Sequence, residues 1–323
     1  MRRPTGNRRG VALLAALWLV VAIATVSMQF ALEARDRRSL GILAAERGIQ
    51  RAAMSGELAL MQAKLEYALK VGPTDNNVAT LAASDPWLTV DSTYSGTFYV
   101  DSTPVEVHAI DLGEKLNVNQ MTETDLRNFF SFLLGDYSKA TQLSQTIMDW
   151  RDADSIPRPS GAEHDDYIKA GMLALPTNST FRDVADLQNV MGMTPDIYAQ
   201  IEPYLTTHGG GQVNINTAPV PVLRALPGMT DALVNMILQQ RSQGRRINSL
   251  AQLTGAQGRP GRPIPGQLNA AQLQGALGAR VVYRVTQVEL TMTSRVGPQA
   301  PPSRMVVVLG QSRGNANVVY KEW

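Results

Sequence analysis

Carboxylate side chains are concentrated in one stretch of this sequence, DWRDADSIPRPSGAEHDDYI, from Asp149 to Ile168. Hard oxygen donors on a segment with Pro, Ser and Gly suit Ca²⁺, which takes roughly six to eight oxygens in irregular geometry. The spacing is not that of an EF-hand loop, because the glycine and the closing glutamate are missing. A calcium site and an acidic surface loop with helix caps therefore remain equally open. The candidate ligands are Asp152, Asp154, Glu163, Asp165 and Asp166.

Other chemistry has little support in these residues. The chain has no cysteine, which excludes disulfides, thiolate metal sites and cysteine nucleophiles. Its three histidines, His108, His164 and His208, lack the spacing of a metal-binding helix. No nucleophile elbow, P-loop or dinucleotide fingerprint is present. The sequence therefore predicts a protein that is not an enzyme, and a metal hydrolase ranks third among its possible functions.

The basic pI of about 8.9 comes from the start of the chain. Four arginines lie within the first ten residues: Arg2, Arg3, Arg8 and Arg9. Without these four of the 30 basic residues, 26 remain against 28 acidic ones, a net charge of −2. Global charge therefore gives no argument for a nucleic-acid partner if the head is removed.

The segment Val11–Leu32 carries no charge and would form a helix about 33 Å long, enough to cross a membrane. The preceding arginines favour a cytoplasmic N-terminus. Apolar residues continue with helical spacing at Met54, Leu58, Met61 and Leu65, before Gly72-Pro73 ends the pattern. One helix over Val11–Val71 is therefore predicted, with its first half in lipid and its second half packed on a soluble domain.

Strand patterns lie on both sides of a long helical region. TFYVDSTPVEVHAIDLG predicts a β-hairpin, and RVVYRVTQVELTMTS, SRMVVVLGQS and NVVYKEW predict three later strands. Residues 73–96 are expected to form a loop. The expected fold class is α+β, with a long N-terminal helix packed on a small antiparallel sheet and a large inserted all-α domain.

The inserted region contains an internal repeat. Residues 116–128 align without gaps to residues 213–225, so that Asn117 and Asn119 match Asn214 and Asn216. Thr122 and Thr217 are the candidate helix caps. A second similarity pairs the segment beginning at Phe181 with INSLAQL, which begins at Ile247. Stacked helix-turn-helix units are expected.

The second repeat resembles a helix-hairpin-helix module, as used to bind DNA phosphates. Its turn, Gly228-Met229-Thr230, lacks the second glycine that would bring backbone N–H groups to a phosphate. The basic cluster Arg241–Arg246 is the feature that favours nucleic acid. A solvated face or an acidic protein partner is the preferred interpretation of that cluster.

The N-terminal segment resembles the leader of type IV pilins and type II secretion pseudopilins, in which a basic head ends in glycine directly before the apolar helix. The resemblance implies that a prepilin peptidase cuts between Gly10 and Val11 and leaves the helix attached. The family's glutamate at the fifth mature position is replaced here by Ala15. A buried charge in an apolar filament must be paired, so this subunit cannot offer that contact.

The ordered set of motifs is similar to the type II secretion minor pseudopilin K family: the glycine-ended leader, Ala15, the Asn-x-Asn repeats, the acidic loop and INTAPVPVLRALPG. This resemblance implies a leader (1–10), a long helix (11–72), a pseudopilin αβ domain (73–112 and 280–323) and an inserted α-domain (113–279) with SAM-like or helix-hairpin-helix repeats. It also implies calcium at the acidic loop, and so favours the calcium site over the acidic surface loop.

The resemblance further implies a protein of the bacterial inner membrane whose soluble part is periplasmic. It would cap or initiate the pseudopilus tip together with the I and J types of minor pseudopilin. Ala15, Val20, Met54, Leu58, Met61 and Leu65 would pack against helices of sister subunits. Whether the α-domain contacts exported substrates stays open. The alternative is a membrane-anchored helix-hairpin-helix receptor for nucleic acid.

Overall fold

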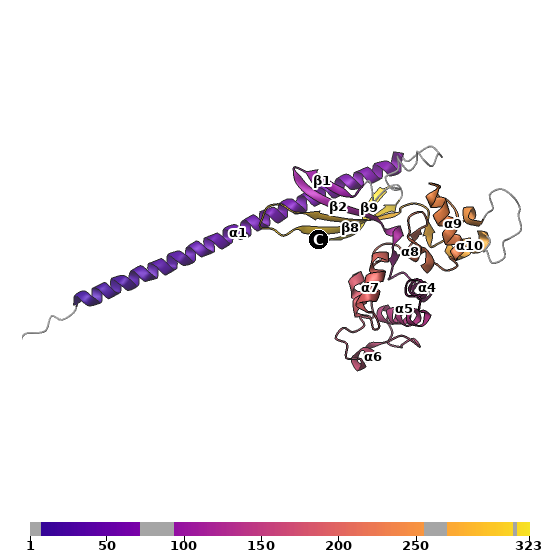
Figure 1. The fold of residues 1–323 in the computed structure, drawn as a ribbon. Helices are drawn as coiled ribbons and strands as arrows, with labels where there is room; N and C mark the ends of the chain where they lie inside the picture. The colour runs from indigo at the N-terminus through magenta and orange to yellow at the C-terminus, as the bar shows by residue number, and fades with distance from the viewer. Residues whose placement is uncertain (1–7, 72–93, 255–269, 313–314) are drawn as a thin grey trace, which may run out of the picture. The chain divides into compact units, whose positions relative to one another are not determined.

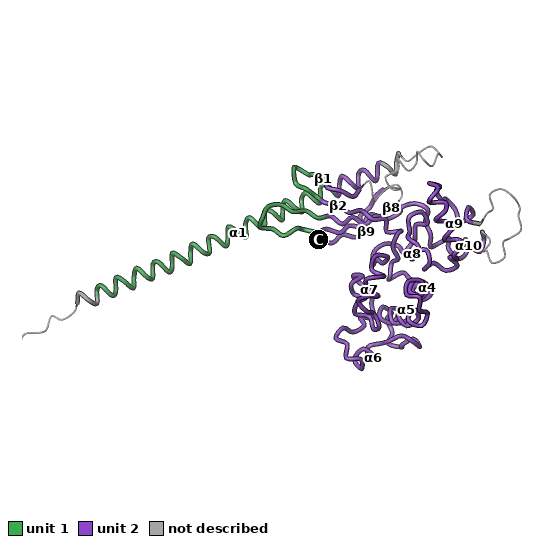
Figure 2. Tube along the Cα trace, in the orientation of Figure 1, with its two compact units in different colours: residues 1–57, 98–105, 293–304 green, residues 58–97, 106–292, 305–323 purple. Residues whose placement is uncertain are grey.

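The computed structural model describes residues 8–71, 94–254, 270–312 and 315–323. The chain divides into two compact units, which are residues 1–57, 98–105 and 293–304, and residues 58–97, 106–292 and 305–323 (Figure 2). The predicted domain boundaries do not follow this division and stay a prediction. The expected leader cut lies within α1, whereas the loop expected before the first strand lies almost wholly outside the described residues.

Helix α1 (Arg8–Val71) is continuous, as predicted for Val11–Val71 (Figure 1). The most apolar window of its segment Ala12–Tyr67 has a mean hydropathy of 2.1 and no buried residue. By length and composition it could cross a membrane. Gly41 and Gly48 have no atom within 4 Å of where a Cβ would lie, so packing inside the chain does not require a glycine at either position.

The apolar stripe on α1 is used within this chain. Met54, Leu58, Met61 and Leu65 have exposed fractions of 0, 6, 0 and 1%. The predicted packing of this half of the helix on a soluble domain is therefore confirmed. The further interpretation, that these four residues contact helices of sister subunits, is wrong, because their side chains are covered in the isolated chain.

A five-stranded sheet has the order β1-β2-β7-β8-β9. Figure 1 labels β1, β2, β8 and β9 of this sheet. Its strands are β1 (Gly96–Val100), β2 (Thr103–Asp111), β7 (Gln287–Ser294), β8 (Ser303–Ser312) and β9 (Asn315–Glu322). The first two form the predicted hairpin, whose turn residues Asp101 and Ser102 have φ of 45° and 67°. Along β7, buried and half-buried residues alternate, as expected for a strand with one covered face.

Between β2 and β7 the described chain is mainly helical, with strands of only two residues. The predicted helical insertion is therefore confirmed. Its elements are η2 (Leu112–Glu114), β3 (Leu116–Asn117), α4 (Glu123–Leu134), α5 (Tyr137–Arg151), α6 (His164–Lys169), η3 (Val184–Asn189), α7 (Pro195–Ile201), η4 (Glu202–Tyr204), β4 (Leu205–Thr206), β5 (Val213–Asn214), α8 (Val220–Ala225), α9 (Asp231–Ser242), η5 (Leu250–Thr254), α10 (Ala270–Leu277) and β6 (Val281–Val282).

These elements form two copies of one unit. In the first copy β3 pairs in parallel with β4, and in the second copy β5 pairs in parallel with β6. Each copy runs from a short strand through two helices, a 3₁₀ turn and a further helix to its partner strand, and the first copy also contains α6 and η4. The predicted repeat is therefore a whole folded unit, and we call the copies the first repeat and the second repeat.

The second asparagine of each Asn-x-Asn motif closes its repeat. Asn119 exchanges two hydrogen bonds of 2.9 Å with the backbone N–H and C=O of Phe181. Asn216 does the same with Ile247, at 2.9 and 2.8 Å. The predicted similarity between the segments that begin at Phe181 and Ile247 is thus confirmed as an equivalence in three dimensions.

An arginine holds the same place in both repeats. Arg151, at the end of α5, donates to the carbonyls of Val118 and Met121. Arg241, in α9, donates to Ile215 O at 2.6 Å and to Ala218 O at 2.7 Å. Each guanidinium thus binds the backbone carbonyl of the middle residue of the Asn-x-Asn motif and a second carbonyl three residues further along the chain.

The two expected helix caps have different outcomes. Thr122 caps α4 in a capping box with Asp125, as predicted. Thr217 is not a cap, because α8 begins after Pro219. The Thr217 hydroxyl instead donates to the carboxylate of buried Asp111, at 2.8 Å.

Candidate metal centre

The acidic loop is the part of the first repeat that has no counterpart in the second. In the first repeat the chain passes from Arg151 to Phe181 through α6 and its flanking loops. In the second repeat it passes from Arg241 to Ile247 in a few residues. Because Arg151 and Phe181 are both fixed to the Asn-x-Asn segment, the inserted loop is anchored at both ends.

Three of the predicted ligands lie together. Asp152 directly follows α5, Asp154 lies in the loop, and Glu163 directly precedes α6. Each offers one carboxylate oxygen, and these three oxygens lie within 4.8 Å of one another. We call this set the carboxylate cluster.

The cluster contains buried oxygens without partners. Glu163 is 4% exposed, and neither of its carboxylate oxygens has a hydrogen-bond partner among the described residues. The same holds for Oδ1 of Asp152. Burial raises the pKa of Glu163, and the nearby carboxylates of Asp149, Asp152 and Asp154 raise it further. A buried carboxylate without a donor is costly unless a cation satisfies it.

The other two predicted ligands lie outside the cluster. Asp165 is exposed and lies 3.5 Å from the imidazole of His164. Asp166 accepts the backbone N–H of Glu163 at 3.2 Å and lies 3.6 Å from Lys169 Nζ. The first turn of α6 therefore uses Asp166 as a helix cap. This is the role expected of it if the acidic segment is a surface loop with helix caps.

Asp154 is held by the loop around it. Its Oδ1 accepts the backbone N–H of Ile156 at 2.9 Å, and its backbone carbonyl accepts the amide of Asn178 at 2.8 Å. Asn178 lies near the far end of the inserted loop, so both halves of the loop meet at Asp154.

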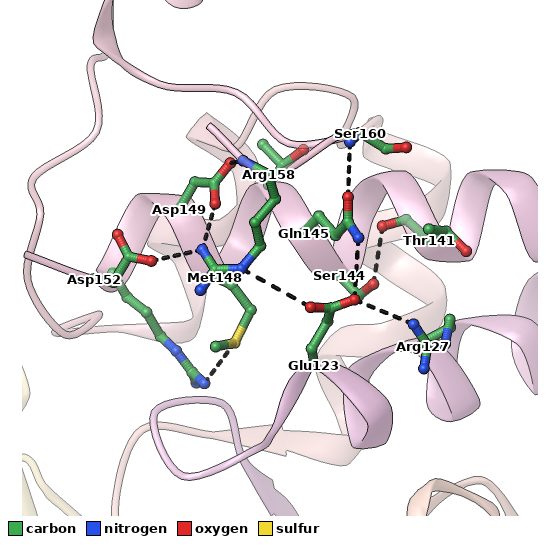
Figure 3. A network of polar contacts seen from close by, with 12 residues as sticks. Glu123, Arg127, Thr141, Ser144, Gln145, Met148, Asp149, Asp152, Arg158 and Ser160 are labelled. Carbon is green, nitrogen blue, oxygen red and sulfur yellow. Dashed lines mark hydrogen bonds and ion pairs between the residues drawn. The ribbon is translucent and has the colours of Figure 1, made fainter. Parts of the chain in front are cut away.

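Asp149 and Arg158 were not predicted as part of the site. The side chain of Asp149 is fully buried, and both its oxygens accept hydrogen bonds from Arg158 (Figure 3). Burial raises the pKa of Asp149, whereas the hydrogen bonds from Arg158 oppose that rise. The sequence signal was present: Arg158 is the only basic residue between Arg151 and Lys169, apart from His164.

The donor set suits a hard divalent cation. Three carboxylates, with three buried oxygens free of hydrogen bonds, provide the oxygen ligands that Ca²⁺ prefers. The contributing residues come from a helix end, a loop and a helix start, an irregular arrangement that Ca²⁺ tolerates better than Mg²⁺ does. The residues present therefore fit the ion.

The basic cluster Arg241–Arg246 has mainly internal roles. Arg241 is hydrogen-bonded to backbone carbonyls, and burial lowers its pKa to about 10. Arg246 donates to Tyr283 O at 2.8 Å, whereas Arg245 is exposed. The expectation of a solvated or partner-binding face is therefore wrong for Arg241 and Arg246. The same contacts weaken the argument for nucleic acid.

The described fold is that of a known class of protein. A long apolar N-terminal helix followed by an antiparallel sheet, with a helical insertion, is the architecture of a pseudopilin. Residues 111–209 match one sequence model described as Type II secretion system (T2SS), protein K, and residues 213–274 match a second. The first range spans the first repeat, and the second range covers the second repeat from β5 into α10. The chain belongs to the type II secretion system protein K family.

Individual relatives agree with this assignment. The protein K of Dickeya chrysanthemi is 35% identical over 114 residues, which are 33% of this chain and 31% of that protein. The protein K of Pseudomonas aeruginosa is 26% identical over 253 residues, 73% of each chain. The alignment therefore spans about a third of the length of the Dickeya protein.

A solved structure has a similar fold. It is a chain in the crystal structure of the GspK-GspI-GspJ complex from the type 2 secretion system of enterotoxigenic Escherichia coli. The TM-score is 0.52 at 16% identity, over 93% of this chain and 98% of that one. At this identity the likeness establishes the α+β fold with its long N-terminal helix.

Proposed function

We propose that this chain is a minor pseudopilin that initiates or caps the pseudopilus tip of a bacterial type II secretion system, with no enzymatic activity. The observation that carries the proposal is the pair of helical repeats inserted between β2 and β7 of a sheet that follows an apolar helix. Both repeats match the protein K family, and the similar crystal structure is of a complex with two further pseudopilins.

The proposed partners are the I and J types of minor pseudopilin, with prepilin peptidase as the processing enzyme at Gly10–Val11. The chain would reside in the inner membrane through α1, with its N-terminus cytoplasmic and its soluble part periplasmic. Its missing glutamate at Ala15 is consistent with a subunit that needs no earlier subunit to pair with. A role of the α-domain in contacting exported substrates remains part of this proposal.

Contacts with sister helices would use a face of α1 other than the buried stripe. Ile42, Ile49 and Leu60 are exposed by 36, 47 and 52%. Steps of seven and eleven residues place them in one line along the helix. Apolar side chains in a line on a helix are suited to packing against a second helix.

Calcium is part of the same proposal. Asp152, Asp154 and Glu163 would hold the ion, and backbone carbonyls or water would complete its coordination. The ion would offset two of the three negative charges of the cluster and so stabilise the loop inserted in the first repeat. We propose no chemical step at this centre.

A secretion assay tests the proposal. Deleting the gene in its host should leave the exported proteins in the periplasm, and the wild-type gene should restore their release. Continued export without the gene would contradict the proposal. The nucleic-acid alternative is tested by a gel shift of the purified chain at low salt, where phosphate binding is strongest. Absence of a shift would remove that alternative.

A further inference from the structure

The carboxylate cluster is assembled from the two ends of a loop. Asp152 and Glu163 are separated by a turn-rich segment, yet their carboxylates belong to one cluster. Bringing the ends of a loop together costs conformational entropy, and clustering three carboxylates adds repulsion. Some other interaction must therefore hold the loop closed before an ion arrives.

Arg158, in the middle of this segment, makes that interaction. Its Nη1 donates to Oδ2 of Asp152 at 2.6 Å and also to Oδ1 of Asp149. Its backbone N–H donates to Oδ2 of Asp149 at 3.1 Å, and its Nε lies 3.9 Å from Glu123 (Figure 3). One residue thus ties the loop to the end of α5 and to the start of α4.

The hydrogen bonds divide the carboxylates into two groups. Both oxygens of Asp149 are occupied by Arg158, so Asp149 takes no part in the cluster. Asp152 gives only Oδ2 to Arg158, and its Oδ1 stays buried without a partner. A ligand carboxylate fixed through its second oxygen is the arrangement by which outer hydrogen bonds orient metal ligands.

We propose that Arg158 is the positioning residue of the metal centre. It orients Asp152 so that Oδ1 is available to a divalent cation, and it closes the loop that brings Glu163 to the same point. This inference rests on the proposed calcium centre and goes beyond it by assigning the residue that preorganises the centre.

The return of the loop after Arg158 supports this role. Gly161 donates its N–H to Arg158 O at 2.9 Å, and Ser160 donates to the side chain of Gln145 at 2.7 Å. A Cβ at Gly161 would lie 1.8 Å from Oδ2 of Asp149. The chain therefore passes close over the Asp149–Arg158 pair before it reaches Glu163.

A competing role for Arg158 predicts the opposite change in the affinity for Ca²⁺. If Arg158 merely neutralised the acids in place of the ion, removing it would raise the negative charge and tighten cation binding. If it positions Asp152, removing it should weaken binding by roughly 10–100-fold, as for other outer-shell partners. The direction of the affinity change therefore separates the two roles.

The test is calorimetric titration of the full chain in detergent with CaCl₂. Arg158→Met removes the guanidinium. Arg127→Met is the matched control, because Arg127 pairs with Glu123 at 3.1 Å in the same network without contacting the cluster. We expect Arg158→Met to bind Ca²⁺ at least 10-fold more weakly and Arg127→Met to match the wild type. Equal or tighter binding by Arg158→Met overturns the inference.

A second pair of variants covers the case in which Arg158→Met does not fold. Arg158→Lys keeps the charge, but a single ammonium does not reproduce the planar guanidinium fork between two carboxylates. It should bind Ca²⁺ several-fold more weakly than Arg127→Lys, and equal affinities would overturn the inference. A wild-type chain that binds no Ca²⁺ would instead refute the proposed metal centre, and Arg158 would lose the assigned role with it.

Discussion

Asn119 and Phe181 are joined by two reciprocal hydrogen bonds across the base of the loop that carries the carboxylate cluster. Asn119→Ala would leave the N–H and C=O of buried Phe181 without partners. We expect a loss of about 2–4 kcal/mol in the free energy of unfolding, from two unsatisfied buried groups. We also expect weaker Ca²⁺ binding, because one end of the loop is released. Urea denaturation and calorimetry measure the two effects.

Asn216→Ala is the matched control for that prediction. It removes the equivalent bonds to Ile247 in the second repeat, where no acidic loop is inserted. It should cost similar stability and leave the affinity for Ca²⁺ unchanged. Equal losses of Ca²⁺ affinity in both variants would show that the effect is not transmitted through the loop.

Glu163→Gln should separate two effects of the Glu163 carboxylate, which are its cost to stability without Ca²⁺ and its contribution to stability with Ca²⁺. In chelator the variant should melt at a higher temperature than the wild type, because a buried charge close to other carboxylates is removed. With CaCl₂ the wild type should gain stability and the variant should gain little. Asp152→Ala combined with Asp154→Ala should also abolish the calcium-dependent rise. A variant that keeps the full rise would exclude Glu163 as a ligand.

The two faces of α1 should respond differently to substitution. Met61→Ala truncates a fully buried side chain and should cost about 2–5 kcal/mol of stability. Ile49→Arg changes an exposed residue and should leave stability within about 0.5 kcal/mol. It should nevertheless weaken co-purification with the I and J partners. Unimpaired co-purification of Ile49→Arg would exclude this part of the exposed line from the interface.

Processing at the leader can be tested by intact-mass spectrometry of the membrane form. In cells with an active prepilin peptidase the mature chain should begin at Val11. Gly10→Val should block the cut, whereas Gly6→Val, within the same basic head, should not. A wild-type protein that keeps Met1 in such cells would contradict the leader assignment.

Local patterns predicted much of this molecule. Alternating apolar residues predicted β7, because the pattern of a strand depends on residues close in sequence. The matching Asn-x-Asn motifs predicted the repeats, because similar segments fold alike. Arg158 was missed because its partners are selected by the fold of the loop. Arg241 was misread for a related reason: a basic residue in a polar stretch gives no sign that its guanidinium binds backbone carbonyls.

The stripe of Met54, Leu58, Met61 and Leu65 shows a second limit. Periodicity predicted that this face is buried, and it is. Periodicity does not specify what covers a face, so the assignment of these residues to sister subunits was wrong. The acidic loop shows a third limit of prediction from sequence. Asp165 and Asp166 are aspartates of the same segment as Asp152 and Asp154, yet they lie outside the carboxylate cluster.

The proposed function makes this chain one subunit of a tip complex. The most direct test is native mass spectrometry of the full chain co-expressed with the I-type and J-type pseudopilins of its own genome. We expect a single species with one copy of each of the three chains. A chain that remains a monomer, while the other two associate with each other, would refute the proposed tip complex.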